Sequence, residues 1–214
     1  MNTFAFKEIE KQIKQWIQLD YISPEDIPSI ELYMDQITTF MDKQLAGNKR
    51  QADDKILTKT MINNYSKNSL LPPSDKKKYS KDHIILLIYI YYMKSFLSIS
   101  DIQNLLSPMT DSYFHAESGT TMSDIYSNLF QLEQQYGIHI RDNVEEVCKI
   151  AEQQFGESDD YLKTFAMIIM LSYDIYAKKQ LIERLIDSVK PPVPSKAELK
   201  EAKQKEKQVK KEQQ

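Results

Sequence analysis

The sequence predicts an all-α protein, chiefly because apolar residues recur at intervals of three and four along much of its 214 residues. The first such series is Phe6, Ile9, Ile13, Trp16 and Ile17. Serine or threonine precedes several of these series in the position of a helix N-cap, and proline or glycine interrupts them. Hydrophobic residues make up 41% of the chain, which is enough for a packed core. We therefore expect helices packed around an apolar interior.

The first part of the chain is predicted to form an N-terminal unit followed by two helices. Residues 1–27 make up the N-terminal unit, with a helix to about residue 19 and a second helix start at "SPED". Apolar spacing predicts a helix between Pro28 and Leu45, and a polar loop follows it. Thr58 is the expected N-cap of a short helix, which must end before the double proline at 72 and 73 because proline removes a backbone donor.

The remainder of the chain is also predicted to be helical. The apolar run from His83 to Met93 covers about half of the roughly 20 residues that a membrane span needs, so we expect a buried helix capped by Ser80. A further helix starts near Ser98, and the aperiodic stretch 108–122 is the expected boundary to a second helical module, residues 123–189. Breaks within this module are predicted at Gly137 and Gly156. Residues 190–214, a tail rich in Lys, Glu and Gln, are expected to be disordered.

The composition argues against several classes of function. Cys148 is the only cysteine, which excludes an intrachain disulfide and a multi-cysteine zinc site. The three histidines lie far apart in the sequence, and none is spaced with a second metal ligand. With four glycines, the chain has neither a phosphate-binding loop nor a dinucleotide fingerprint. The sequence therefore predicts no catalytic residues, no cofactor and no metal, and we expect that the protein is not an enzyme.

Positive charge is concentrated in one internal segment of an acidic chain. Residues 55–81 contain seven lysines and one aspartate, a net charge of +6, and the tail from Lys190 carries +4. Subtracting both from the total of −3 leaves −13 on the other residues. Lysines can neutralise nucleic-acid phosphates, and asparagine, threonine and tyrosine can donate to phosphates or contact base edges. The segment is thus a candidate nucleic-acid site, although a solvated lysine loop would have the same composition.

The order of motifs in this segment resembles a known class of DNA-binding protein. "TMINNYSKNSLLPP", "KKKYSKDH" and "FLSISDIQNLL" follow one another as do the recognition helix, basic wing and next helix of the MerR family of bacterial regulators. The chain is still more similar to an uncharacterised bacterial family of unknown function that carries this MerR-like region, with "LYMDQITTFMD" as a further hallmark. The resemblance implies a winged helix-turn-helix module over residues 28–107, with a small β-wing. The polar insertion "LAGNKRQADDK" departs from the tight turn of typical MerR-like proteins, and the long dimerising helix and effector-binding cysteines of metal-sensing members are missing.

The resemblance also implies a set of residues at the DNA. The helix from Thr58 to Asn68 would enter the major groove, and the wing would meet phosphate or the minor groove. The implied contact residues are Thr58, Lys59, Asn63, Asn64 and Lys67 on the helix and Lys76, Lys77, Lys78 and Tyr79 on the wing. Met61, Ile62, Leu70 and Leu71 would pack inward, and Tyr65 is expected in the core.

Two functions fit these features. The first is a DNA-binding transcriptional regulator that acts as a homodimer on double-stranded DNA, with residues 123–189 pairing the subunits or receiving a signal. The second is a non-catalytic adaptor that keeps a winged-helix scaffold and binds an acidic protein. The N-terminus has no secretory signal, so we expect a cytoplasmic protein without a membrane partner.

Overall fold

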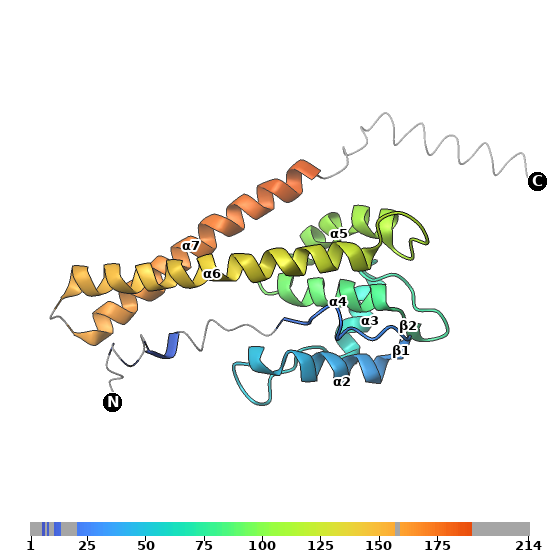
Figure 1. Ribbon diagram of the computed structural model, residues 1–214, viewed down its shortest axis with the longest axis horizontal. Coiled ribbons are helices and arrows are strands. Elements are labelled where there is room, and N and C mark those ends of the chain that lie inside the picture. The colour runs from blue at the N-terminus through green and yellow to red at the C-terminus, as the bar shows by residue number, and fades with distance from the viewer. Residues whose placement is uncertain (1–5, 7, 9–10, 14–20, 157–158, 190–214) are drawn as a thin grey trace, which may run out of the picture.

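The structure, a computed structural model, describes residues 6, 8, 11–13, 21–156 and 159–189. These residues form helices and one two-stranded sheet, which confirms the predicted all-α fold class (Figure 1). The elements are β1 (Leu32–Tyr33), α2 (Met34–Gln44), the 3-10 helix η1 (Ala46–Asn48), α3 (Lys59–Lys67), β2 (Lys78–Tyr79), α4 (Lys81–Met93), α5 (Ile99–Tyr113), α6 (Met122–Phe155) and α7 (Asp160–Val189). The predicted tail, residues 190–214, lies outside the described residues, as does most of the predicted N-terminal helix, of which residues 6, 8 and 11–13 are helical.

Three helix starts lie where the sequence predicts them. The Thr58 hydroxyl accepts the amide hydrogen of the third residue after it at 3.2 Å, at the start of α3. Ser80 precedes α4, and Ser98 caps α5 by accepting an amide hydrogen at 3.1 Å. Such caps satisfy backbone donors that the first helical turn leaves free, which is why short polar side chains mark these positions.

The helix predicted at Ser23 is wrong, and the one predicted from Pro28 begins later. Residues 23–26 form a turn, in which the Asp26 amide donates to the Ser23 carbonyl at 3.0 Å. The chain then bends at residues 27, 29 and 30, and α2 begins only at Met34, because Leu32 and Tyr33 form β1, which pairs with β2 in an antiparallel sheet. Sequence spacing does not reveal a two-residue strand whose partner lies more than forty residues away.

Two predicted breaks are also misplaced. Helix α5 continues through Pro108 to Tyr113, and the hydroxyls of Ser107 and Thr110 bond carbonyls one turn back at 2.7 and 2.9 Å. Tertiary packing of the helix outweighs the single donor that proline removes. Helix α6 passes through Gly137 without interruption. The predicted break at Gly156 is confirmed, because this residue caps α6 with a positive φ of 44°.

Helix α4 forms the centre of the larger core. Its residues from His83 to Ile88 are all buried, and α5 and α6 lie against it. Apolar residues of α2 and α3 belong to the same cluster, including Ile37 and Ile62. This burial on every side explains the continuous apolar run that the sequence shows. Among the described residues, no helix is both long enough and apolar enough to cross a bilayer.

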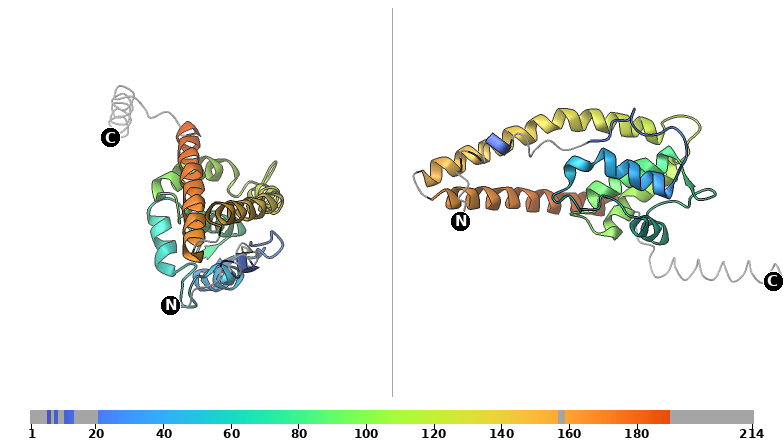
Figure 2. Two further views of the ribbon diagram at one scale, coloured as in Figure 1. Left: turned by 90° about the vertical axis from the view of Figure 1, so that its left-hand side faces the viewer. Right: turned by 90° about the horizontal axis from the view of Figure 1, so that it is seen from below.

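Helices α6 and α7 form a hairpin that extends beyond this core (Figures 1 and 2). A second cluster of buried residues holds its far end together, comprising Phe6, Ile13, Val147, Cys148, Ala151 and Met167. The near end of the hairpin joins the larger core through Met122, Tyr126 and Ile186. The Tyr126 hydroxyl also donates to the Ile22 carbonyl at 2.6 Å. The near end of residues 123–189, the predicted second module, thus packs into the larger core, while its far end has a cluster of its own.

Candidate nucleic-acid interface

Helix α3 presents one apolar face to the core and one polar face to solvent. Ile62 and Tyr65 are buried, as expected, and Leu70 and Leu71 continue the buried side after the helix ends. On the opposite side, spaced by three and four residues, Thr60, Asn63, Asn64 and Lys67 are exposed. The buried face fixes the orientation of the helix, so the exposed side chains project together from the molecule.

The end of α3 is closed by a backbone motif that sets the direction of the next segment. The Leu70 amide donates to the Tyr65 carbonyl at 2.8 Å and the Ser69 amide to the Ser66 carbonyl at 3.1 Å. Ser69 has a positive φ of 54°. These are the bonds of a Schellman motif, with the accompanying apolar contact supplied by the buried Tyr65 and Leu70. The motif ends the helix before the double proline and turns the chain back toward α5.

We call residues 75–79 the wing, which is a tight turn with two lysines at its tip. The Lys78 amide donates to the Asp75 carbonyl at 2.7 Å, and both intervening residues, Lys76 and Lys77, have positive φ of 47° and 66°. This is the backbone pattern of a type I′ turn, which Asn-Gly or Asp-Gly normally occupies. Residues with a Cβ are strained there, and such strain is often found at functional sites. The two lysines thus sit at a place where local stability alone would favour other residues.

The sheet joins the wing to α2. Leu32 pairs with Tyr79 and Tyr33 pairs with Lys78. Above this pairing, the Lys78 ammonium lies 5.8 Å from the centroid of the Tyr33 ring, within the range of a cation–π contact. No signal in the sequence places Tyr33 in the site, because its position depends on a strand pair that only the structure reveals.

Helix α3 and the wing flank a common hollow. It is open to solvent, with a volume of about 440 Å³, and its lining comprises Tyr33, Met34, Asp35, Asn63, Ser74, Lys77 and Tyr79. At its edge, Lys59 of α3 forms an ion pair with Asp35 of α2, and both side chains are largely exposed. Asp35 is therefore a second residue that sequence reasoning missed, and it places a carboxylate among the lysines.

The expected contact residues differ in their access to solvent. Lys59, Asn63, Asn64, Lys67, Lys76 and Lys77 are exposed. Thr58 and Lys78 are half-buried, and the Thr58 hydroxyl is already used as the cap of α3. Tyr79 is only 5% exposed and belongs to the larger core. The Tyr79 ring packs in the core beneath the wing, so Tyr79 offers almost no surface for a contact with nucleic acid.

A buried histidine supports the wing from the side of α4. The Tyr79 ring packs edge-on against His83 at a centroid distance of 5.4 Å, and Phe114 packs on the same imidazole at 4.8 Å. The Ser80 amide donates to His83 Nδ1 at 3.0 Å, so the proton of the neutral ring resides on Nε2. Burial lowers the pKa of His83 below its usual range, although nearby backbone carbonyls partly oppose this effect. The wing therefore packs against a neutral imidazole.

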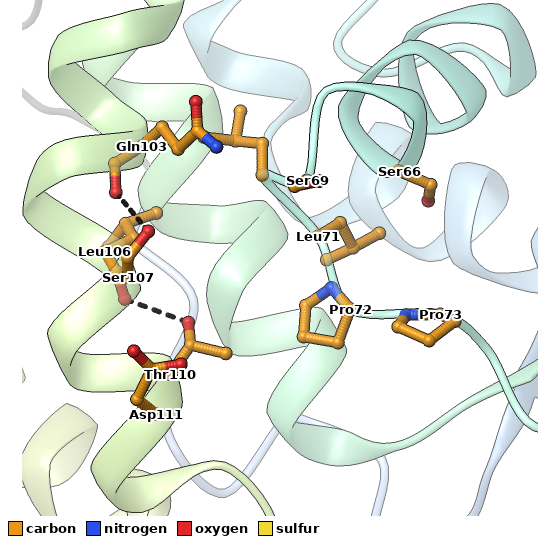
Figure 3. Close-up of a pocket in the computed structure, with 11 residues that line it drawn as sticks. Ser66, Ser69, Leu71, Pro72, Pro73, Gln103, Leu106, Ser107, Thr110 and Asp111 are labelled. Atoms are coloured by element: carbon orange, nitrogen blue, oxygen red, sulfur yellow. Dashed lines mark hydrogen bonds between the residues drawn. The ribbon is translucent and has the colours of Figure 1, made fainter. Parts of the chain in front are cut away.

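A separate small cavity lies behind α3, between the segment that follows it and α5 (Figure 3). Its volume of about 180 Å³ is below the range of about 300 to 1,000 Å³ that is common for ligand pockets. Two of its hydroxyls, those of Ser107 and Thr110, already donate to backbone carbonyls of α5. Among the residues that the structure describes, no three His, Cys, Asp or Glu side chains are grouped to hold a metal ion. The exposed face of α3 and the wing is the stronger candidate site.

The fold and this face define a helical protein that presents a short polar helix and a lysine turn side by side. Residues 22–129 match the family described as Domain of unknown function (DUF1836), and this match covers half of the chain. The chain belongs to that family. The matched residues extend from before β1 to within α6 and so include the whole candidate interface. No curated protein and no solved structure matches the chain.

Proposed function

We propose that the chain is a sequence-specific, DNA-binding transcriptional regulator of MerR-like type that acts as a homodimer. The observation that carries this proposal is the placement of α3 and the wing on one face, around a shared hollow lined by Asn63 and Lys77. A polar helix beside a cationic turn is the arrangement by which winged helix-turn-helix proteins bind the major groove and the adjacent backbone.

The side chains on this face suit two kinds of contact. The amides of Asn63 and Asn64 can donate to and accept from the edge of an adenine in the major groove, which reads sequence. Lys67, Lys76 and Lys77 carry exposed ammonium groups that suit phosphate oxygens and release counterions on binding. The helix would thus select the site, while the wing would supply most of the affinity that is independent of sequence.

The proposal is tested by removing the wing charge and comparing it with an equal loss of charge elsewhere. The test variant is Lys76→Ala, Lys77→Ala, Lys78→Ala. The control is Lys149→Ala, Lys178→Ala, Arg184→Ala on the α6–α7 hairpin, whose three side chains are exposed. Fluorescence anisotropy of a labelled duplex from the chain's own promoter region, titrated at two salt concentrations, reports both affinity and its salt dependence.

We expect the wing variant to lower the slope of log K against log salt by roughly 0.9 for each lost phosphate contact, up to about three contacts. The control should bind as the wild-type chain does. Equal weakening by both variants would mean that net charge alone governs binding. A wild-type chain that binds neither the promoter duplex nor a random duplex at low salt would contradict the proposal and favour the acidic-protein adaptor.

A further inference from the structure

The far half of α7 carries an apolar face that no described residue covers. Its opposite face is buried through Met167, which packs in the second core cluster with Val147 and Phe6. The uncovered residues are 41% to 72% exposed, and we define them as the apolar stripe: Leu162, Phe165, Ile168, Ile169, Tyr173 and Tyr176. Their spacing of three and four residues places them along one side of the helix.

The stripe is larger than a monomer usually exposes. Large apolar side chains bury about 150 to 250 Å² each, so six of them at these exposures present on the order of 700 Å². The largest apolar patch of a typical monomer is about 300 to 600 Å². Two such stripes in contact would bury roughly 1,400 Å², within the range of about 1,200 to 2,000 Å² for a specific interface.

The stripe is also electrically neutral. No charged residue lies between 164 and 173. The nearest charges on either side are already paired: Lys163 bonds Asp160 at 3.3 Å and Asp174 bonds Lys178 at 2.6 Å. The Ser172 hydroxyl, in the middle of the face, donates to the Ile168 carbonyl at 2.6 Å and is satisfied within the helix. The stripe can therefore be buried without burying an unpaired charge.

We infer that the apolar stripe is the contact between two copies of this chain, related by a twofold axis. Because the stripe carries no charged side chain, a twofold contact between two identical chains brings no like charges together within the stripe. A membrane surface fits less well, because interfacial helices carry lysine and arginine beside their apolar face and the only basic residue from 161 to 177 is the paired Lys163. The tail, residues 190–214, has no aromatic residue and too few apolar side chains to cover the stripe.

This contact would leave the candidate interface free. The closed end of the hairpin, where α6 meets α7, lies at the opposite end of the molecule from α3 and the wing (Figures 1 and 2). Two chains joined through the stripe would therefore keep both polar faces open to solvent. The inference rests on the homodimer of the proposed function but not on DNA binding, so the two can fail separately.

The molar mass of the full chain in solution, measured by light scattering after gel filtration without DNA, tests the inference. The test variant is Ile169→Glu, and Phe165→Glu serves as a second substitution within the stripe. The matched control is Leu181→Glu, on the same helix with 58% exposure but outside the stripe. All three positions are at least 48% exposed, so none of the substitutions removes a buried side chain, and circular dichroism checks that helix content is kept.

At about 10 µM we expect twice 25.1 kDa for the wild-type chain and for Leu181→Glu. Ile169→Glu and Phe165→Glu should give 25.1 kDa, because each substitution acts on both subunits and raises the dissociation constant by more than about 100-fold. A monomeric wild-type chain would overturn the inference. So would dimeric stripe variants, or a Leu181→Glu chain that is monomeric, since the contact would then not lie at the stripe.

Discussion

The face of α3 and the wing differs from the apolar stripe of α7 in almost every physical respect. The first is polar and positively charged, and it includes two lysines held at positive φ. The second is neutral and apolar, and it lies on one regular helix. Salt weakens contacts of the first kind and leaves contacts of the second kind nearly unchanged. We propose that the two surfaces, at opposite ends of one fold, bind partners of different chemistry.

Removing a base-reading amide should sharpen this contrast most. We expect Asn63→Ala to lose about 1 to 3 kcal/mol of binding free energy on the promoter duplex, because one bidentate contact to a base is lost. Binding to a random duplex should stay the same, and so should the molar mass. Paired anisotropy titrations on the two duplexes measure this difference. Asn143→Ala, an exposed amide on α6, is the control, and an equal loss on both duplexes would contradict the role of α3 in reading sequence.

A second prediction concerns the pH dependence of stability, which we expect to come from His83 beneath the wing and not from the wing lysines. Because burial lowers the pKa of His83 in the folded chain, the unfolded chain binds more protons below the ordinary histidine pKa of about 6.5. The free energy of unfolding therefore keeps its full value above that pH. It decreases as the pH falls, by no more than about 1.4 kcal/mol per pH unit. Urea unfolding between about pH 5 and pH 8 measures it.

His83→Gln should flatten this dependence, because glutamine can make the same capping contact to the Ser80 amide and does not titrate. His139→Gln, at an exposed position of α6, should retain the wild-type slope. If both variants keep the wild-type dependence, the neutral imidazole beneath the wing is not its source.

The smallest expected effect is an increase in affinity. Asp35 places a carboxylate at the edge of the candidate interface and pairs with Lys59. Asp35→Asn removes the repulsion between this carboxylate and a phosphate and releases Lys59, so we expect binding to any duplex to tighten by roughly two- to fivefold. Asp42→Asn, which breaks the ion pair of Asp42 on α2 with Lys49 after η1, is the matched control for anisotropy. Weaker binding by Asp35→Asn alone would show that the pair positions Lys59.

Local signals in the sequence predicted much of the fold. Thr58, Ser80 and Ser98 mark the starts of three helices because capping depends on a few adjacent residues. The helix breaks predicted at Pro108 and Gly137 are wrong, because packing against the rest of the chain keeps α5 and α6 continuous. Local signals decide the structure at some sites and tertiary packing decides it at others. The spacing of residues in the sequence does not show which of the two is stronger at a given site.

The candidate site was predicted in part, for the same reason. The exposed residues of α3 could be assigned once the buried face was known, because helical periodicity separates Ile62 from Asn63. The burial of Tyr79 and the place of Tyr33 depend on the pairing of two short strands far apart in the chain. The apolar stripe was hidden as well, because the apolar residues of α7 surround the helix and only the packing of Met167 shows which side is covered.

The most direct test of the central claim is the affinity of the wild-type chain for its promoter duplex, measured by anisotropy at about 50 and 200 mM salt. We expect a preference over random duplex and, for about five phosphate contacts, a loss of roughly 10² to 10³ in affinity between the two salts. The molar mass of the chain without DNA should be the same at both. Binding that ignores salt, or no binding at the lower salt, would contradict the account of α3 and the wing as a nucleic-acid interface.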